Sequence, residues 1–343
     1  MAATTVNGSG NGARSGAQTL VLLAAPLNIL ILRALSVGRK QQAELRQEAG
    51  SPAQTTLRAQ LKKLTEIGAI EKHRRNHFPG VLEYELTAAG RDLLFVVDTL
   101  ENWLESAPEG RLPLGGNAAK AAIKALAESW SSTMIRALSA RPLSLTELDR
   151  VIGSLSYPAL ERRFAAMRLA GLVEARQGEG RGTPYGVTDW LRQGVAPLAA
   201  AARWERRHLP QGTPSIGRFD VEAAFLLTVP MLRPPSELSG SCRLAAELSD
   251  GKKRRLAGVV VEVKNGAVES CTTSLSGDVD AWTLGSSIAW LHAVIEASTD
   301  GLELGGNGAF SRALIEDLHG TLFGTNRVPA LDSDESIEED RAN

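Results

Sequence analysis

Residues 51–72 read SPAQTTLRAQLKKLTEIGAIEK and carry the punctuation of one short amphipathic helix. Ser51 is a good N-cap, Pro52 suits the first helical position, and Gly68 is placed to end the helix. Leucines at i, i+4, i+7 spacing form a predicted buried stripe of Leu57, Leu61 and Leu64. We therefore expect a helix over 52–67 that packs through this stripe onto its own domain.

The segments around this helix complete an ordered set of elements. Strand-like residues at 69–71 and 83–86 predict a hairpin whose turn lies at 76–80. The other expected elements are an apolar helix over 17–37, a short helix over 41–48 and a final helix over 88–104. Three helices, a hairpin and a last helix in this order indicate a winged helix-turn-helix.

The whole block occurs twice. Residues 33–36 (RALS) return as residues 136–139, an offset of 103 that continues without a gap through the predicted third helix. The register then slips by two residues at the hairpin, resumes with Tyr84 over Tyr185 and continues to Trp103 over Trp204. A repeat of this length predicts two tandem copies of one domain.

The fold class predicted for the 343 residues is multidomain α+β. Beyond the second copy, strands are expected over 242–248, 257–263 and 267–274, followed by helices over 284–296 and 309–322. The predicted divisions are a disordered lead (1–16), a first winged helix-turn-helix (17–107), a linker (108–117), a second winged helix-turn-helix (118–210), an α+β domain (215–325) and an acidic disordered tail (326–343).

Charge is distributed unevenly along the chain. The net charge is −1, yet residues 31–80 hold ten Lys or Arg against four Asp or Glu. Residues 134–183 hold eight Arg against five acids. A basic first copy is typical of a protein that releases counterions from a phosphate backbone.

The first copy has a candidate DNA-reading face. With the leucines inward, 100° per residue turns Thr55, Arg58 and Lys62 outward, with Gln54 at the shoulder. Arg58 suits guanine, Gln54 suits adenine, Thr55 suits a thymine methyl or a phosphate, and Lys62 suits phosphate. The hairpin adds Arg74 and Arg75. The alternative is an ordinary solvated helix face.

The second copy keeps the buried stripe but not this chemistry. Glu161 stands where the first copy has Arg58, and Ala165 where it has Lys62. Basic residues that remain for DNA contact are Arg162, Arg163 and Arg181. Two roles stay open: a reader of a different, weaker half-site, or a built-in dimerisation partner.

Residues 31–35, 57–72 and 78–91 resemble the HxlR-type winged-helix transcriptional regulators, and the second copy resembles them through 134–138 and 185–188. The resemblance implies homodimers that read inverted repeats in double-stranded DNA. Here one chain holds both halves, so we predict a covalent pseudo-dimer. The alternative is that each copy dimerises with another chain, giving a homodimer.

Residues 278–285, 290–291 and 300–306 resemble the sterol-carrier-protein-like fold. The resemblance implies an apolar cavity between a sheet and helices that takes a small apolar ligand. The expected lining is Trp282, Trp290, Leu291, Val294, Phe310 and Leu314. The alternative is that these residues simply form the core.

Chemistry other than binding has little support in the sequence. Cys242 and Cys271, the only cysteines, exclude a disulfide scaffold and a Cys-rich zinc site, and are expected to be small buried residues rather than a redox pair. The five histidines are scattered, so no catalytic residue, metal or cofactor is predicted. Pro26 interrupts the short apolar run 19–32, so a cytoplasmic protein without membrane insertion is expected.

The sequence therefore predicts a transcriptional regulator rather than an enzyme. Its tandem winged helices bind operator DNA, and its C-terminal domain senses an apolar effector or mediates assembly. The alternative is a carrier of lipid or another hydrophobe whose winged domains contact proteins.

Overall fold

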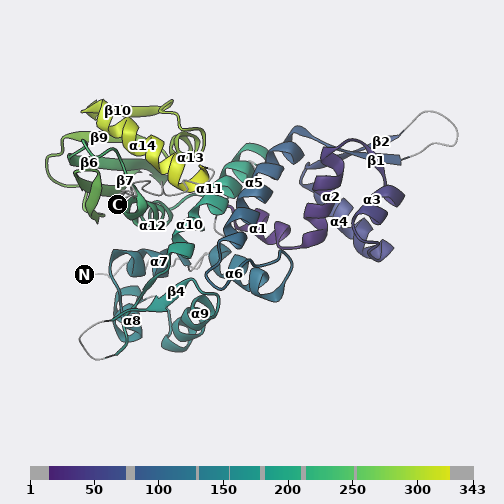
Figure 1. Ribbon diagram of the computed structural model, residues 1–343, viewed down its shortest axis with the longest axis horizontal. Helices are drawn as coiled ribbons and strands as arrows, with labels where there is room; N and C mark the ends of the chain where they lie inside the picture. Colours follow the sequence, from purple (N-terminus) through teal and green to yellow (C-terminus); the bar gives the residue numbers. More distant parts are fainter. Residues whose placement is uncertain are drawn as a thin grey trace, which may run out of the picture.

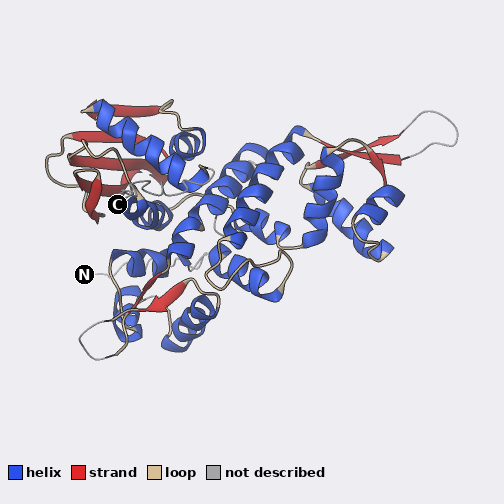
Figure 2. Cartoon of the chain, in the orientation of Figure 1, coloured by secondary structure: helices blue, strands red, loops and turns tan. Residues whose placement is uncertain are grey.

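The computed structural model describes residues 15–74, 82–128, 131–153, 155–177, 182–209, 214–250 and 253–324. The predicted acidic tail and nearly all of the predicted lead lie outside these ranges. The fold is mixed α and β: helices dominate the two repeated units, and the largest sheet lies in the C-terminal unit (Figure 2).

The first unit (residues 17–107) has the predicted order of elements with one break. It contains α1 (Ala17–Leu23), α2 (Pro26–Ser36), β1 (Lys40–Gln41), α3 (Gln42–Glu48), α4 (Gln54–Glu66), β2 (Ile70–Arg74), β3 (Leu82–Leu86) and α5 (Ala88–Glu105). The three strands form an antiparallel sheet of order β1-β3-β2, in which Lys40 pairs with Tyr84. Helices α3 and α4 precede the hairpin, as a winged helix-turn-helix requires.

The prediction of one apolar helix over 17–37 is wrong. The chain bends by 85° between α1 and α2, because Pro26 has no N–H to continue a helix and instead occupies the first turn of α2. Within the described residues no single helix is long and apolar enough to cross a membrane, although this bent pair passes that test by length and composition. Its residues Leu20, Leu23 and Ile31 are buried in the core.

The start of α4 also differs from the prediction, whereas its end is confirmed. Ser51 has a φ of 56°, and its N–H donates to the Arg46 carbonyl oxygen at 2.8 Å, so it closes the turn after α3 instead of capping α4. The N-cap is Ala53. Gly68, at a φ of 72°, ends the helix, where the Ala69 N–H donates back to the Leu64 carbonyl oxygen. The leucine stripe is fully buried, as predicted.

The second unit (residues 117–208) repeats this order. It contains α6 (Asn117–Ala127), α7 (Ser131–Ala140), α8 (Leu145–Ile152), α9 (Tyr157–Leu169), β4 (Val173–Ala175), β5 (Tyr185–Val187), α10 (Asp189–Gln193) and α11 (Val195–His208). Leu143 forms an isolated bridge with Tyr185. These two residues are the sequence equivalents of Lys40 and Tyr84, so the repeat extends to strand register.

The C-terminal unit (residues 214–324) is a five-stranded sheet covered by helices. It contains α12 (Arg218–Thr228), the 3₁₀ turn η1 (Val229–Met231), β6 (Gly240–Asp250), β7 (Lys253–Lys264), β8 (Ala267–Thr272), β9 (Ala281–Ser286), α13 (Ser287–Glu296), β10 (Leu302–Gly306) and α14 (Gly308–Phe323). The strand order is β10-β9-β6-β7-β8, with β6 and β9 parallel. The sequence did not predict α12, β9 or β10. The predicted helix over 284–296 is wrong at its start, since residues 284–286 complete β9.

The two repeated units share one hydrophobic core. Buried residues from Ala17 to Trp204 form a single cluster that also takes in Ala223 and Leu227 of α12. Helices α5 and α11 pack together at the centre, and α1 packs on both α6 and α11. Figure 1 shows the units on either side of this helix pair, with the β2–β3 hairpin at one extremity of the molecule.

Candidate nucleic-acid interface

The outer face of α4 presents the side chains that the sequence assigned to DNA. Gln54, Thr55, Arg58 and Lys62 are all exposed, while the leucine stripe behind them is buried. Lys62 lies 3.6 Å from Glu66, and both side chains are largely exposed, at 76% and 60%. A pair so exposed contributes little to stability. Lys62 can therefore exchange this carboxylate for a phosphate.

Arg58 lies near β3, the central strand of the three-stranded sheet. Burial raises the pKa of the Tyr84 phenol above its ordinary value, and the positive charge of Arg58 partly offsets that rise. Tyr84 itself is buried between the β1 and β2 partners of β3. Arg58 of α4 therefore lies within electrostatic range of β3.

The described part of the hairpin adds exposed positive charge. Lys72 and Arg74, two residues apart on β2, are exposed and make no ion pair with a described residue. Arg75 and the predicted turn at 76–80 lie outside the described residues. The hairpin therefore extends the basic character of α4 along at least one strand.

Carboxylates occupy the base of the same hairpin. His73 Nε2 lies 3.2 Å from Glu71 and 3.1 Å from Glu85, and Arg39 Nε donates to Glu85 at 2.6 Å. Glu71, His73 and Glu85 have the residue types and spacing to hold a metal ion, since their ligand atoms lie within 4.8 Å of one another. Sequence reasoning missed the group because its members stand on two strands. The Arg39 guanidinium already neutralises Glu85, so we interpret the group as a charge-compensated cluster.

Internal ion pairs reduce the basic surface below what the sequence count indicates. Arg33 pairs with Asp98 and Glu101 of α5, and Lys40 pairs with Glu48 at 2.6 Å. In the described ranges Arg58, Lys63, Lys72 and Arg74 have no such carboxylate partner. Positive charge without a described carboxylate partner is therefore present on α4 and β2, and also at Arg46 of α3 and Arg91 of α5.

Comparison with known proteins agrees with this geometry. A family model described as HxlR-like helix-turn-helix matches residues 22–110, which coincide with the first unit. The chain is 33% identical over 85 residues to the uncharacterized HTH-type transcriptional regulator YtcD of Bacillus subtilis, and the match covers 25% of this chain and 68% of YtcD. The chain belongs to the HxlR-like helix-turn-helix family.

Two further matches concern the same kind of protein. The uncharacterized HTH-type transcriptional regulator Rv3095 of Mycobacterium tuberculosis is 33% identical over 86 residues, or 25% of this chain and 54% of the relative. The chain thus spans about half the length of that protein. A crystal structure of the HTH-type transcriptional regulator ytcD is 32% identical, with 25% of this chain and 88% of that chain covered and a TM-score of 0.24.

The corresponding face of α9 differs from the HxlR-like α4. At the repeat offset, the positions of Gln54, Thr55, Arg58, Lys62 and Glu66 are taken by Tyr157, Pro158, Glu161, Ala165 and Leu169. All five are exposed, and Leu169 is 91% exposed. Arg162 is exposed and Arg163 is half-buried, whereas Arg181 lies outside the described residues. This face is apolar and acidic where the HxlR-like unit is polar and basic.

Tryptophans join the HxlR-like unit to the second unit. The rings of Trp103 and Trp190 stack with centroids 4.7 Å apart and planes 11° apart. The Trp103 indole N–H donates to the Trp190 carbonyl oxygen at 2.9 Å, and the Trp190 indole N–H donates to the Trp103 carbonyl oxygen at 2.7 Å. The Trp204 indole N–H donates to the Ala89 carbonyl oxygen at 2.8 Å.

The bonds from Trp103 and Trp204 are equivalent under the repeat. Beyond the hairpin the offset is 101, so Trp204 is the counterpart of Trp103 and Trp190 is the counterpart of Ala89. In each unit, therefore, the equivalent tryptophan of the last helix donates a hydrogen bond to the equivalent carbonyl oxygen of the other unit. Such exchange is the property of an isologous contact.

A buried carboxylate holds the N-terminal helix against α11. Glu205 is 2% exposed and accepts hydrogen bonds from the Gly16 N–H at 2.6 Å, the Thr19 N–H at 2.9 Å and the Thr19 hydroxyl at 3.0 Å. The negative charge at the start of α1 complements the helix dipole. Gly16 has a φ of 86°, and a Cβ there would lie 2.8 Å from the Leu198 carbonyl oxygen, so α1 and α11 approach too closely for a larger residue.

Helix α12 fastens the C-terminal unit to the second unit. Glu222 is buried and forms ion pairs with Arg136 of α7 and Arg218. Arg192 of α10 donates to the Leu226 and Leu227 carbonyl oxygens at 3.2 and 2.8 Å, at the end of α12. Because a buried charge needs a partner, loss of Arg136 would weaken this attachment.

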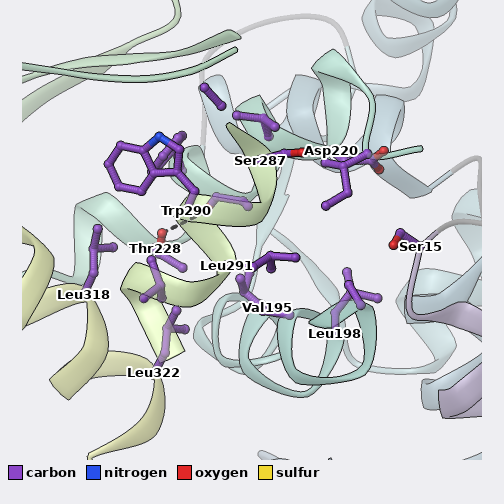
Figure 3. Close-up of a pocket in the computed structure, with 18 residues that line it drawn as sticks. Ser15, Val195, Leu198, Asp220, Thr228, Ser287, Trp290, Leu291, Leu318 and Leu322 are labelled. Atoms are coloured by element: carbon purple, nitrogen blue, oxygen red, sulfur yellow. Dashed lines mark hydrogen bonds between the residues drawn. The ribbon is translucent and has the colours of Figure 1, made fainter. Parts of the chain in front are cut away.

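A cavity lies at this attachment, bounded by α11, α12, α13 and α14 (Figure 3). Of the six residues expected to line a ligand cavity, Trp290, Leu291 and Val294 line this one. The other three predicted lining residues do not. Phe310 and Leu314 are buried in the core of the C-terminal unit, and Trp282 packs against Gly305 on the neighbouring strand. The cavity lies on the side of the C-terminal unit that faces α11, because core side chains such as Phe310 and Leu314 fill the space between the sheet and its helices, where the cavity was expected.

Both cysteines are free thiols, Cys242 buried and Cys271 half-buried. Burial raises the pKa of the Cys242 thiol to about 11 and that of Cys271 to about 12. Thiolate, the reactive form, is therefore scarce at neutral pH. This agrees with a packing role for both residues.

Proposed function

We propose that the chain is a transcriptional regulator that binds double-stranded DNA in a sequence-specific way through α4 and the β2–β3 hairpin. The observation that carries the proposal is the exposed polar and basic face of α4 beside a basic strand, in a unit of the HxlR-like family. A recognition helix buries one face on its own domain and offers the other to the major groove. Arg58, Gln54 and Thr55 are assigned to base edges, and the phosphate contacts to Lys62, Arg74 and Arg75.

We further propose that residues 17–107 and 118–210 are tandem winged helix-turn-helix domains that act as a pseudo-dimer, with 108–117 as their linker. Three observations support this: the repeated strand register, the shared core, and the equivalent hydrogen bonds from Trp103 and Trp204. Internal pairing of this kind fills the role that a second chain has in a homodimer.

The second unit is proposed to be chiefly the built-in partner. Glu161 would face phosphates unfavourably, and Leu169 offers no polar contact, so base reading by α9 has little support. Arg162, Arg163 and Arg181 are proposed to contact phosphate. Residues 215–325 are proposed to form the sterol-carrier-like module through which a small apolar ligand, or assembly, controls DNA binding.

A filter-binding titration of the full chain against salt tests this function. Several phosphate contacts predict a linear fall of the logarithm of the association constant with the logarithm of salt concentration. Lys62→Ala should weaken binding to all sequences alike and reduce the slope by about 1. Lys124→Ala is the matched control, because Lys124 is a similarly exposed lysine with an i,i+4 glutamate, at 3.8 Å, on α6.

Absence of duplex binding at low salt would overturn the proposal. The cavity beside α11 would then favour a carrier of small hydrophobic molecules whose winged-helix units contact proteins.

A further inference from the structure

The cavity between α11 and the C-terminal unit has the size and walls of a site for a small apolar molecule. Its volume is about 130 Å³. Apolar cavities of about 150 Å³ inside proteins accept benzene. Most of the wall is hydrocarbon, contributed chiefly by Leu198, Val221, Phe225, Trp290, Leu291 and Leu318.

One hydroxyl of the wall, that of Ser15, is buried and has no hydrogen-bond partner among the described residues. Ser15 as a whole is 5% exposed. Figure 3 places Ser15 across the cavity from Trp290 and Leu318. Two other polar wall residues are already engaged: the Thr228 hydroxyl donates to the Ala224 carbonyl oxygen at 2.8 Å, and the Asp220 carboxylate accepts from Ser132 and from the Gly217 N–H.

We infer that this cavity binds a small monocyclic molecule with one hydroxyl or carbonyl group, whose ring contacts the apolar wall and whose polar group bonds to Ser15 Oγ. A buried hydroxyl without a partner is unfavourable, and such a ligand satisfies it. The inference rests on the proposed function, because it names the class of the effector and its site.

The position of Ser15 gives the ligand a route to the DNA-binding units. Ser15 precedes Gly16, whose N–H is held by Glu205 of α11, and α1 packs on both α6 and α11. A ligand that bonds to Ser15 therefore stabilises the packed position of α1 between the two units. A ligand shifts the protein toward the conformation for which its affinity is highest. If that conformation also binds DNA differently, the ligand changes the DNA affinity by the same factor by which DNA changes the ligand affinity.

Calorimetric titration of the full chain, without DNA, with phenol and with toluene tests the site. The two probes have nearly the same shape, and phenol carries a hydroxyl where toluene carries a methyl. Ser15→Ala should lower the ratio of phenol to toluene affinity by about three- to tenfold, the value of one hydrogen bond, and leave toluene affinity unchanged. Thr228→Val, which removes a wall hydroxyl that is already bonded to the Ala224 carbonyl oxygen, should leave the ratio as in the original chain.

Ala199→Leu should remove binding of both probes, because Ala199 is a half-buried wall residue of α11 whose enlargement fills the space. Ala224→Leu should fill the cavity from α12, and it replaces Ala199→Leu as the test if that variant is unstable. Lack of binding by either probe, an unchanged ratio in Ser15→Ala, or full binding in folded cavity-filled variants would each overturn the inference. A chain that binds phenol but no duplex DNA would retain this site and lose the regulator function.

Discussion

Helices α4 and α9 occupy equivalent positions in the sequence repeat, yet their outer faces differ in chemistry. In α4 the exposed positions are Gln54, Thr55, Arg58 and Lys62, whereas in α9 the equivalent positions are Tyr157, Pro158, Glu161 and Ala165. Their inner faces are alike: both helices bury three large apolar residues at i, i+4, i+7 spacing. Packing and surface chemistry can therefore vary independently in these helices, because they use opposite sides of the helix.

The junction is the part on which both units depend, so its loss should have the largest effect. Trp103→Ala removes a buried indole that stacks on Trp190 and exchanges two hydrogen bonds with it. The free energy of unfolding should fall by about 3–5 kcal/mol. Urea denaturation followed by circular dichroism measures it.

The milder variants Trp103→Phe and Trp204→Phe keep most of the packing and remove one indole N–H each. Each should cost about 1 kcal/mol, and nearly equal costs are expected if the junction is pseudo-symmetric. A loss below about 1 kcal/mol for Trp103→Ala would contradict the importance of this contact.

Exchanging the chemistry of the two faces should have the next largest effect. Arg58→Ala should weaken binding to a selected operator by about 1–3 kcal/mol and relax base preference at one position. Glu161→Arg, which places an arginine at the equivalent position of α9, should strengthen binding to duplex DNA, because it replaces a carboxylate near phosphates with a cation.

Competition binding with operator and random duplexes measures both changes. Arg162→Ala, on the exposed side of α9, is the comparison for Arg58→Ala and should lower affinity without changing base preference. Equal affinity of Arg58→Ala and the original chain would remove Arg58 from the reading face.

The smallest expected effect concerns the helix before α9. Glu147 forms a capping box with Ser144 at the start of α8, and hydrogen bonds from the Ser144 backbone N–H and hydroxyl, with help from Arg141, lower its pKa from 4.5 to about 2. A lowered folded-state pKa contributes stability that is complete above the unfolded value and is lost as pH falls through the folded value. Glu147→Gln should therefore melt slightly earlier at pH 7 and lose that deficit between about pH 4.5 and 2. A difference in melting temperature that grows on acidification would contradict this assignment.

Much of the repeated architecture was predictable because its signals are local. The leucine stripe and Gly68 at the end of α4 follow from spacing along one segment, and the structure confirms both. The repeat offset predicts a second buried stripe at the same spacing, and α9 has it. The errors lie where distant contacts or turn geometry decide. Ser51 closes a turn through Arg46 instead of capping a helix, and Pro26 divides an apolar run into two helices at 85°.

The candidate DNA face could be placed on the outside of α4 from the sequence, since burial of one helix face fixes the exposure of the other. Its net charge could not, because Arg33 and Lys40 are neutralised by carboxylates that approach only in the fold. Helix α12 was missed for a related reason: its residues divide between two cores, so no single apolar stripe marks it.

The amino-acid sequence alone was enough to find the repeated residue pattern, the inner and outer faces of α4 and α9, and the basic composition of the first unit. These properties can be found from residue identity and spacing along the chain. The folded structure was needed to show that Trp103, Trp190 and Trp204 join the two units, that Glu205 holds α1 in place, and that a cavity beside α11 has a buried hydroxyl without a partner among the described residues. The tryptophan and Glu205 contacts join residues 87 or more positions apart, which spacing along the chain does not specify.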